Sequence, residues 1–211
     1  MPSSRTPSPK PAAPGKSAAK PQASTARAPH EVRIIGGLWK RTKLPVADKP
    51  GLRPTPDRVR ETLFNWLGQD LNGWRCIDAF AGTGALGLEA ASRGAADVLL
   101  VDQDGDLVAK LRAIAAKLQA SGVSVERANG LSVLQRLAPG KMDLVFLDPP
   151  FEASLYEKAL AAAAPALAPE GLVYLESPTA WTDELLTPFG LAVQRHVKAG
   201  AVHAHLLRRT A

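Results

Sequence analysis

Four consecutive residues, Asp148-Pro149-Pro150-Phe151, are the strongest candidate for chemistry in this chain. They follow the apolar run 142–147, and because two prolines cannot donate to a sheet ladder, a strand over this run must end by Asp148. Its last carbonyl groups are then free to accept hydrogen bonds. A carboxylate, free carbonyls and an aromatic ring suit a flat group that carries an amine. The alternative interpretation is a tight turn after a strand.

The second candidate is the glycine-rich segment 82–87, which matches the pattern G-x-G-x-x-G and is followed by Asp102. This pattern is typical of dinucleotide binding, with the later acid on the ribose, so an NAD-dependent oxidoreductase is one interpretation. Asp78 favours another, because a carboxylate at the end of the first strand would oppose a pyrophosphate. S-adenosylmethionine has a sulfonium, an ammonium group and no phosphate. We therefore expect Asp78 near its ammonium group and Asp102 on its ribose hydroxyls.

Strand-like and helix-like segments alternate along the part of the chain that must position these residues. The strand-like runs are 75–80, 97–102, 123–128, 143–148, 171–176, 190–197 and 202–208, and the helix-like segments are 85–93, 104–120 and 153–164. Alternation predicts an α/β fold whose mostly parallel, seven-stranded sheet has helices on both faces. The last two runs lack room for a helix between them, so they should form an antiparallel hairpin. Ligands of such sheets bind beyond the carboxyl ends of the strands, where both candidates lie.

A small N-terminal appendage is expected before the sheet. Residues 31–37 and 44–47 resemble short strands around a basic turn. Residues 55–67 are predicted to form a helix, with Thr55 as the N-cap and Pro56 at the first helical position. The apolar residues that recur on one face of this helix are Val59, Leu63, Trp66 and Leu67.

The composition indicates one main domain, since 211 residues with 45% apolar content bury a single good core. Residues 1–30 contain seven prolines, five Lys or Arg and no acid, which predicts a disordered basic tail. No continuous apolar stretch is long enough for a secretory signal or a membrane span, so we expect a cytoplasmic protein. The predicted division of the chain is a tail over 1–30, an appendage over 31–68 and a main domain over 69–211.

The net charge of +6 is unevenly distributed. Without the tail, 21 Lys or Arg face 20 Asp or Glu, so the remainder is nearly neutral. Residues 31–60 still carry eight basic side chains against three acids. This imbalance favours a basic entrance that contacts phosphates, and an ordinary solvated surface is the alternative.

Cysteine and histidine usage gives no sign of a disulfide or a metal centre. Cys76 is the only cysteine and lies in an apolar run, so we expect a small core residue in a reducing compartment. His203 and His205 would share one strand face, but without a third ligand nearby they make a poor metal site. We therefore expect no metal, and a surface or RNA-facing role for the two histidines.

Four segments in order resemble a known family. The sequence "DAFAGTGALGLEAASRGA" followed by "DPPF" is similar to class I methyltransferases that modify exocyclic amines of DNA, RNA or protein glutamine. The segments "RIIGGLWKRTKLPV" and "GLRPTPDRVRETLFNWL" narrow the resemblance to the bacterial RsmD family, whose members methylate N2 of guanine 966 in 16S ribosomal RNA. The resemblance covers residues 32–208. The chain departs from the family at Asp102, where glutamate is common, and at Asn129-Gly130, which replaces a more polar pair.

The resemblance implies a Rossmann-like class I fold, S-adenosylmethionine as the cofactor, and a monomer that acts on 16S ribosomal RNA, free or within a partly assembled 30S subunit. The implied catalytic residues are Asp148, Pro149, Pro150 and Phe151. The implied cofactor-binding residues are Asp78, Phe80, Gly82, Gly84, Gly87, Asp102 and Asn129. The implied RNA-binding residues are Arg33, Lys40, Arg41, Lys43, Arg53 and Arg58.

In this interpretation the Asp148 carboxylate and a backbone carbonyl of Pro149-Pro150 accept the two N–H groups of the guanine amine, which aims its lone pair at the methyl group. Phe151 stacks on a base that has left its own stack. The non-functional alternatives are that Phe151 is a core aromatic residue and that the basic residues belong to an ordinary helix surface. Three other functions stay open: another amine-directed nucleic-acid methyltransferase, the oxidoreductase, and an RNA-binding protein without catalysis.

Overall fold

The computed structural model describes residues 31–47, 49, 54–150 and 153–210. Its strands are β1 (Glu31–Arg33), β2 (Lys43–Pro45), β3 (Arg75–Asp78), β4 (Asp97–Asp102), β5 (Val123–Arg127), β6 (Met142–Leu147), β7 (Leu167–Ser177), β8 (Leu191–Ala199) and β9 (Val202–Arg209). Its helices are α1 (Asp57–Trp66), α2 (Ala85–Ser92), α3 (Gly105–Lys117), α4 (Gly130–Arg136), α5 (Ala153–Ala166), α6 (Asp183–Leu186) and the 3₁₀ turn η1 (Thr187–Phe189). No helix among these residues is long and apolar enough to cross a membrane.

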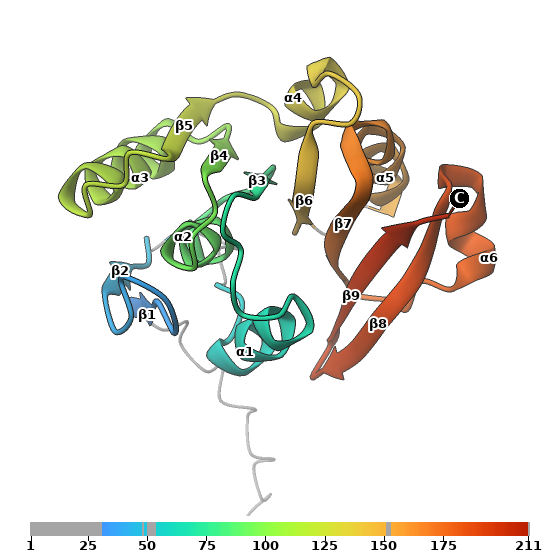
Figure 1. Cartoon of the computed structure of the whole chain (residues 1–211), viewed down its shortest axis with the longest axis horizontal. Helices are drawn as coiled ribbons and strands as arrows, with labels where there is room; N and C mark the ends of the chain where they lie inside the picture. Colours follow the sequence, from blue (N-terminus) through green and yellow to red (C-terminus); the bar gives the residue numbers. More distant parts are fainter. Residues whose placement is uncertain (1–30, 48, 50–53, 151–152, 211) are drawn as a thin grey trace, which may run out of the picture.

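The main sheet has seven strands in the order β5-β4-β3-β6-β7-β9-β8 (Figure 1). Strands β3 to β7 are parallel to their neighbours in this set. The predicted C-terminal hairpin is confirmed, because β9 runs antiparallel to both β7 and β8. The strand order reverses direction at β3, and ligands of such sheets usually bind beyond the carboxyl ends of the strands at this point.

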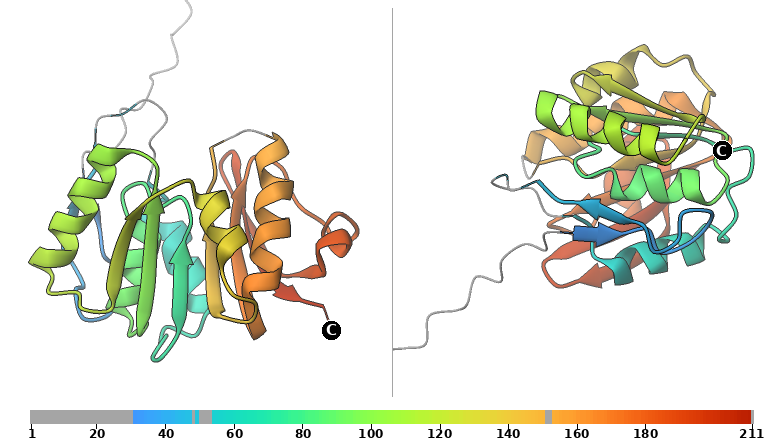
Figure 2. Two further views of the ribbon diagram at one scale, coloured as in Figure 1. Left: turned by 90° about the horizontal axis from the view of Figure 1, so that it is seen from above. Right: turned by 90° about the vertical axis from the view of Figure 1, so that its left-hand side faces the viewer.

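Helices cover both faces of the sheet, with α1 and α2 on one face and α4 and α5 on the other (Figures 1 and 2). Each face has its own apolar cluster. Leu63, Phe64, Leu88 and Leu111 represent the first cluster, and Val145, Leu160 and Leu175 represent the second. Apolar side chains of β1 and β2 belong to the first cluster, so the small N-terminal sheet shares a core with the main one.

A buried carboxylate fastens the N-terminal segment to α2. The Glu89 side chain accepts hydrogen bonds from the backbone N–H groups of Ile35 (2.8 Å) and Gly36 (2.7 Å). It also accepts from the guanidinium groups of Arg60 (3.2 Å) and Arg93 (2.9 Å). Since the Glu89 and Arg60 side chains are fully buried, the four bonds replace the water that both charges lose.

Several elements differ from the sequence-based prediction; among them, α6 was not predicted, and β7 begins at Leu167, four residues before the predicted run 171–176. Helix α1 begins at Asp57 with Pro56 as its N-cap, so the prediction of Thr55 as the cap was wrong by one residue. The Thr55 hydroxyl donates instead to Glu176, 121 residues away in the chain, a partner that local sequence does not reveal. Helix α4 was not predicted, because its seven residues are too few for a helical period to be recognised. The tail over 1–30 lies outside the described residues.

Candidate active site

Three acidic side chains lie at the carboxyl ends of three adjacent strands. Asp78 ends β3, Asp148 follows β6, and Glu176 is the penultimate residue of β7. Strand pairing joins Leu147 with Leu175, so the next residues on β6 and β7, Asp148 and Glu176, are neighbours across the sheet. Asp78 lies on the other side of Asp148, because β3 pairs with β6. The acids therefore form a row along the edge where ligands of parallel sheets bind.

Asp78 is fully buried and only partly satisfied. Its Oδ2 accepts a hydrogen bond from the backbone N–H of Gly87 (3.1 Å), whereas its Oδ1 is buried without a partner among the described residues. Burial raises the pKa of the Asp78 carboxyl to about 7, against the opposing effect of the Gly87 bond. A cationic group placed beside Oδ1 would stabilise the ionised form. The orphaned oxygen thus fits the ammonium group of S-adenosylmethionine better than a pyrophosphate.

The glycine-rich segment has the geometry that its sequence predicts. Gly82 and Gly84 have φ angles of 52° and 76°, in the left-handed region that side chains disfavour. Asp102 ends β4 beside this turn, where its Oδ2 accepts from the N–H of Gly82 (2.9 Å) and its Oδ1 from that of Asp104 (2.8 Å). These bonds orient the carboxylate and leave each oxygen a further lone pair for a ribose hydroxyl.

Gly87 has a packing role in the same site. A Cβ atom there would lie 2.2 Å from a methyl carbon of Leu100 and 3.2 Å from Cβ of Asp78. Only glycine lets α2 approach β3 and β4 this closely, and that approach brings the Gly87 N–H to Asp78.

Asp148 is placed as its sequence context predicts, immediately after β6, which ends at Leu147. Its carboxyl group is partly buried, and burial, followed by the charges of Glu176 and Asp78, holds its pKa well above the usual range. Pro149 is buried and Pro150 is exposed. Phe151 lies outside the described residues.

Glu176 is the member of the row that sequence reasoning missed. It is buried, and its Oε1 accepts hydrogen bonds from Thr55 (2.7 Å) and Tyr174 (2.9 Å). Burial raises the pKa of its carboxyl, and the two hydroxyl donors oppose this rise. An acid within the predicted strand 171–176 was a usable signal, since a strand buried on both faces has no ordinary place for it.

Two other predicted cofactor residues lie near the strand ends. Phe80 follows β3 and is partly buried against the second apolar cluster. Asn129 is exposed and is the N-cap of α4, where its Oδ1 accepts from the N–H of Ser132 (3.1 Å). This cap occupies the oxygen of the Asn129 side chain, and its amide N–H groups stay available for a ligand.

The predicted RNA-binding residues are not brought together. Arg33 and Lys43 form exposed ion pairs with Asp57 and Glu31. Arg58 lies exposed in the first turn of α1, near the carboxyl edge. Arg53 lies outside the described residues.

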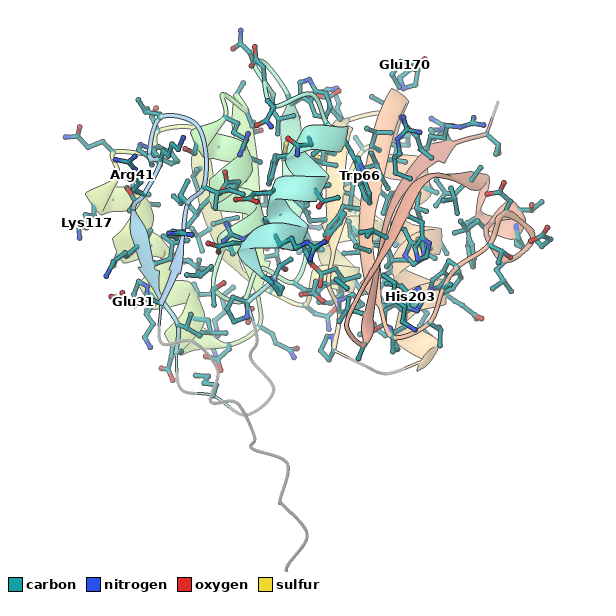
Figure 3. The ribbon with its side chains drawn as sticks, turned by 90° about the horizontal axis from the view of Figure 1, so that it is seen from below. Glu31, Arg41, Trp66, Lys117, Glu170 and His203 are labelled. Atoms are coloured by element: carbon teal, nitrogen blue, oxygen red, sulfur yellow. The ribbon has the colours of Figure 1, made fainter. Side chains whose placement is uncertain are left out.

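The basic turn that carries Lys40 and Arg41 is at the opposite edge of the sheet. Ser92, the last residue of α2, accepts hydrogen bonds from the backbone N–H groups of Leu38 and Trp39. Because α2 is about 12 Å long and begins at the glycine-rich turn, these contacts hold the basic turn about that far from the carboxyl edge. Figure 3 shows Arg41 and Glu31 at opposite ends of the β1-β2 pair, with Glu31 at the level of His203. A groove of about 520 Å³ that Lys40 helps to line lies at this amino edge, away from Asp148.

The histidine interpretation needs correction, because strand pairing brings a third histidine to the predicted two. His196 of β8 pairs with His205 of β9, and the candidate ligand atoms of His196, His203 and His205 lie within 4.8 Å of one another. Nε2 of His196 and Nδ1 of His203 are hydrogen-bonded to each other at 2.9 Å, so each of these nitrogens already has a partner. The N–H of Trp181 donates to Nε2 of His205, which leaves the proton of the neutral ring on Nδ1. This arrangement does not suit a metal ligand.

Cys76 is buried in the first apolar cluster, as predicted for a core residue. Burial raises the pKa of its thiol, so it has no thiolate character at neutral pH.

Comparison with known proteins gives a consistent result. The family model "Conserved hypothetical protein 95" matches residues 32–208. Ribosomal RNA small subunit methyltransferase D of Escherichia coli strain K12 is 44% identical over 185 residues, which cover 86% of this chain and 91% of that protein. The protein of the same name from Haemophilus influenzae is 40% identical and is covered over 96% of its length. A solved structure, "Putative methyltransferase yhhF from Escherichia coli", superposes with a TM-score of 0.75 at 42% identity, over 86% of this chain and 99% of that one.

Proposed function

This chain belongs to the family of "Conserved hypothetical protein 95", the RsmD family, and from that membership and its row of acids we propose that it methylates N2 of guanine 966 in 16S ribosomal RNA. Its substrate is 16S ribosomal RNA, and we place the reaction in a partly assembled 30S subunit, with the protein acting as a monomer. S-adenosylmethionine supplies the electrophilic methyl group. The observation that carries the proposal is a buried, half-satisfied Asp78 two strand positions from Asp148, because such a pair would suit a cation and an amine lying side by side.

The chain's own residues divide the work between the two sites. Asp78 holds the ammonium group of the cofactor, and Asp102 holds its ribose hydroxyls. Phe80, the glycine turn and Asn129 complete the cofactor side. Asp78 is the last residue of β3 and Asp102 is the last residue of β4. The proposed cofactor site therefore occupies the half of the carboxyl edge that β3 and β4 form.

Asp148 performs the amine chemistry on the β6 side. The guanine amine is a poor nucleophile, because its lone pair is delocalised into the ring. Accepting its two N–H groups, one by Asp148 and one by a backbone carbonyl of Pro149-Pro150, favours a pyramidal nitrogen whose lone pair faces the methyl group. The N–C bond would form as the bond between the methyl carbon and the sulfonium sulfur breaks, with the electron pair of that bond going to sulfur, and the amine would lose a proton to Asp148, whose raised pKa suits a proton acceptor, or to solvent.

The basic side chains around the N-terminal segment position the RNA through its phosphates. Arg33, Lys43 and Arg58 contact RNA at the carboxyl edge, and Lys40 and Arg41 contact RNA at the other edge; Arg53, which lies outside the described residues, is a further candidate phosphate contact. The RNA-contacting surface would then extend from the carboxyl edge of the sheet to its amino edge, a length that a large folded RNA can cover.

Two measurements test the proposal. In calorimetric titrations, the protein should bind S-adenosylmethionine and should not bind NAD. Binding of NAD would favour the oxidoreductase interpretation. Small subunits from cells that lack this protein should then accept one radiolabelled methyl group, located on guanine by nucleoside analysis. Label on adenine or on protein would contradict the guanine assignment, and an absence of label would contradict methyl transfer to this RNA.

A further inference from the structure

Glu176 lies on the side of Asp148 away from the proposed cofactor site, and this is the side toward which an acceptor base must extend. The order of adjacent strands is β3, β6 and β7, and their carboxyl ends carry Asp78, Asp148 and Glu176. Asp78 belongs to the cofactor side, so a base whose amine meets Asp148 extends toward β7. The neighbouring charge of Glu176 also contributes to the raised pKa of Asp148, which agrees with the short separation that the strand pairing predicts.

Two hydroxyl groups fix the orientation of the Glu176 carboxylate. Thr55 and Tyr174 both donate to Oε1, at 2.7 and 2.9 Å. All three side chains are at most 5% exposed, so this arrangement is held by the surrounding core. Among the described residues, no hydrogen bond ends on Oε2. Oε2 is not one of the buried side-chain atoms that lack a partner, so Glu176 presents one oriented acceptor that a ligand can reach and that the described residues do not use.

The edge of guanine that carries N2 also carries a second donor, the ring N1–H. We propose that Oε2 of Glu176 accepts this N1–H while Asp148 accepts an N2–H, so that Glu176 selects guanine against the other amine-bearing bases. This inference rests on the proposed function and deepens it. Adenine and cytosine carry a lone pair, and no hydrogen, on the ring nitrogen next to the amine. An ionised Oε2 at that position repels the lone pair and has no donor of its own, which makes the discrimination strong.

The variant Glu176→Gln reverses the polarity of this contact. The hydroxyl groups of Thr55 and Tyr174 favour the amide oxygen at the position of Oε1, so the amide NH₂ faces the base. A donor there opposes the N1–H of guanine and matches a ring nitrogen with a lone pair. 2-Aminopurine is the matched probe, because it keeps the amine at position 2 and has an unprotonated N1.

The experiment compares subunits rebuilt with guanine or 2-aminopurine at the target nucleotide. With the wild-type protein, we expect single-turnover methylation of guanine to be faster by at least about tenfold. With Glu176→Gln, the preference should shift toward 2-aminopurine by at least about tenfold, while affinity for S-adenosylmethionine stays the same. Glu170→Gln is the matched control, since Glu170 is an exposed acid near the start of the same strand, far from this edge, and should keep the wild-type preference (Figure 3).

A second variant keeps the test decisive if Glu176→Gln does not fold. Thr55→Val removes one of the two donors that fix the carboxylate, and the preference for guanine should fall. An unchanged guanine preference in a folded Glu176→Gln protein, or an equal loss of rate on both RNAs, would overturn the role of Glu176 alone. A wild-type protein that labels neither RNA would overturn the proposed function and this inference with it.

Discussion

The backbone N–H of Gly87 donates to Oδ2 of Asp78 over 3.1 Å, which ties the first turn of α2 to the end of β3. Oδ1 of Asp78 has no partner at hydrogen-bond geometry among the described residues, although the backbone N–H of Phe80, like that of Gly87, lowers the pKa of this carboxyl. Burial raises the pKa of this carboxyl group to about 7 when no cation is beside it. Binding of a cation must then be coupled to loss of the Asp78 proton.

We predict that affinity for S-adenosylmethionine falls when the pH is lowered from about 8 to about 6, by up to about tenfold per pH unit below 7. The sign follows from the raised pKa of Asp78: below it the free site is protonated, and the proton must leave before the ammonium group binds. Calorimetry across this range measures the effect. Asp78→Asn cannot titrate at this position, so its remaining pH dependence reports the cofactor and the other two acids of the row, Asp148 and Glu176. Identical pH profiles for the two proteins would contradict the placement of the ammonium group.

Asp148 should affect the chemical step and leave cofactor binding nearly intact, because its contact with the amine matters most in the transition state. We predict that Asp148→Ala lowers the single-turnover rate by about 100-fold or more. Asp148→Asn should retain more activity, since its amide oxygen still accepts an N–H. Rapid-quench measurements with bound S-adenosylmethionine decide this, and a wild-type rate for Asp148→Ala would refute the role.

Glu89 should dominate the stability of the N-terminal segment. Glu89→Ala leaves the buried Arg60 without its buried partner and removes the acceptor of two backbone N–H groups, so we expect a loss of about 3 to 5 kcal/mol in the free energy of unfolding. Urea denaturation measures the loss, and hydrogen exchange should be faster at Ile35 and Gly36. Glu61→Ala, an exposed acid on α1, should change stability by less than about 0.5 kcal/mol. Equal losses in both variants would contradict the central role of Glu89.

The two sets of basic residues should differ in their effect on RNA affinity. In the described part of the chain, Lys40 and Arg41 form no ion pair, whereas Arg33 and Lys43 each have a carboxylate partner. Replacing Lys40 and Arg41 by alanine should reduce the slope of log affinity against log salt by up to about two units. The Arg33 and Lys43 double variant should change it less. A slope that the first pair of changes leaves unaltered would assign Lys40 and Arg41 to ordinary solvated surface.

The sequence predicted what depends on local chemistry and on strand order. Two prolines after an apolar run end β6 at the residue before Asp148, and the positive φ angles of Gly82 and Gly84 follow from the glycine pattern. The C-terminal hairpin followed from a connection too short for a helix.

Contacts between distant segments could not be predicted in the same way. The Thr55 hydroxyl donates a hydrogen bond to Glu176 and does not cap a helix. His196 comes next to His205 only because strands β8 and β9 pair. Lys40 lies in the same basic segment as Arg58, but the fold places them at opposite edges of the sheet, because the basic turn contacts Ser92 at the end of α2 while Thr55, close to Arg58, contacts Glu176 at the carboxyl edge. Short helices such as α4 lack the periodicity that would identify them.

The central claim, methyl transfer to N2 of guanine, is tested most directly by removing that amine alone. Inosine has the ring and carbonyl group of guanine and keeps its N1–H, but it has no exocyclic amine. Subunits rebuilt with inosine at the target nucleotide should bind this protein and accept no methyl group there, while matched subunits rebuilt with guanine accept one. Methyl transfer to the inosine-substituted nucleotide would contradict the assignment of N2 as the accepting atom.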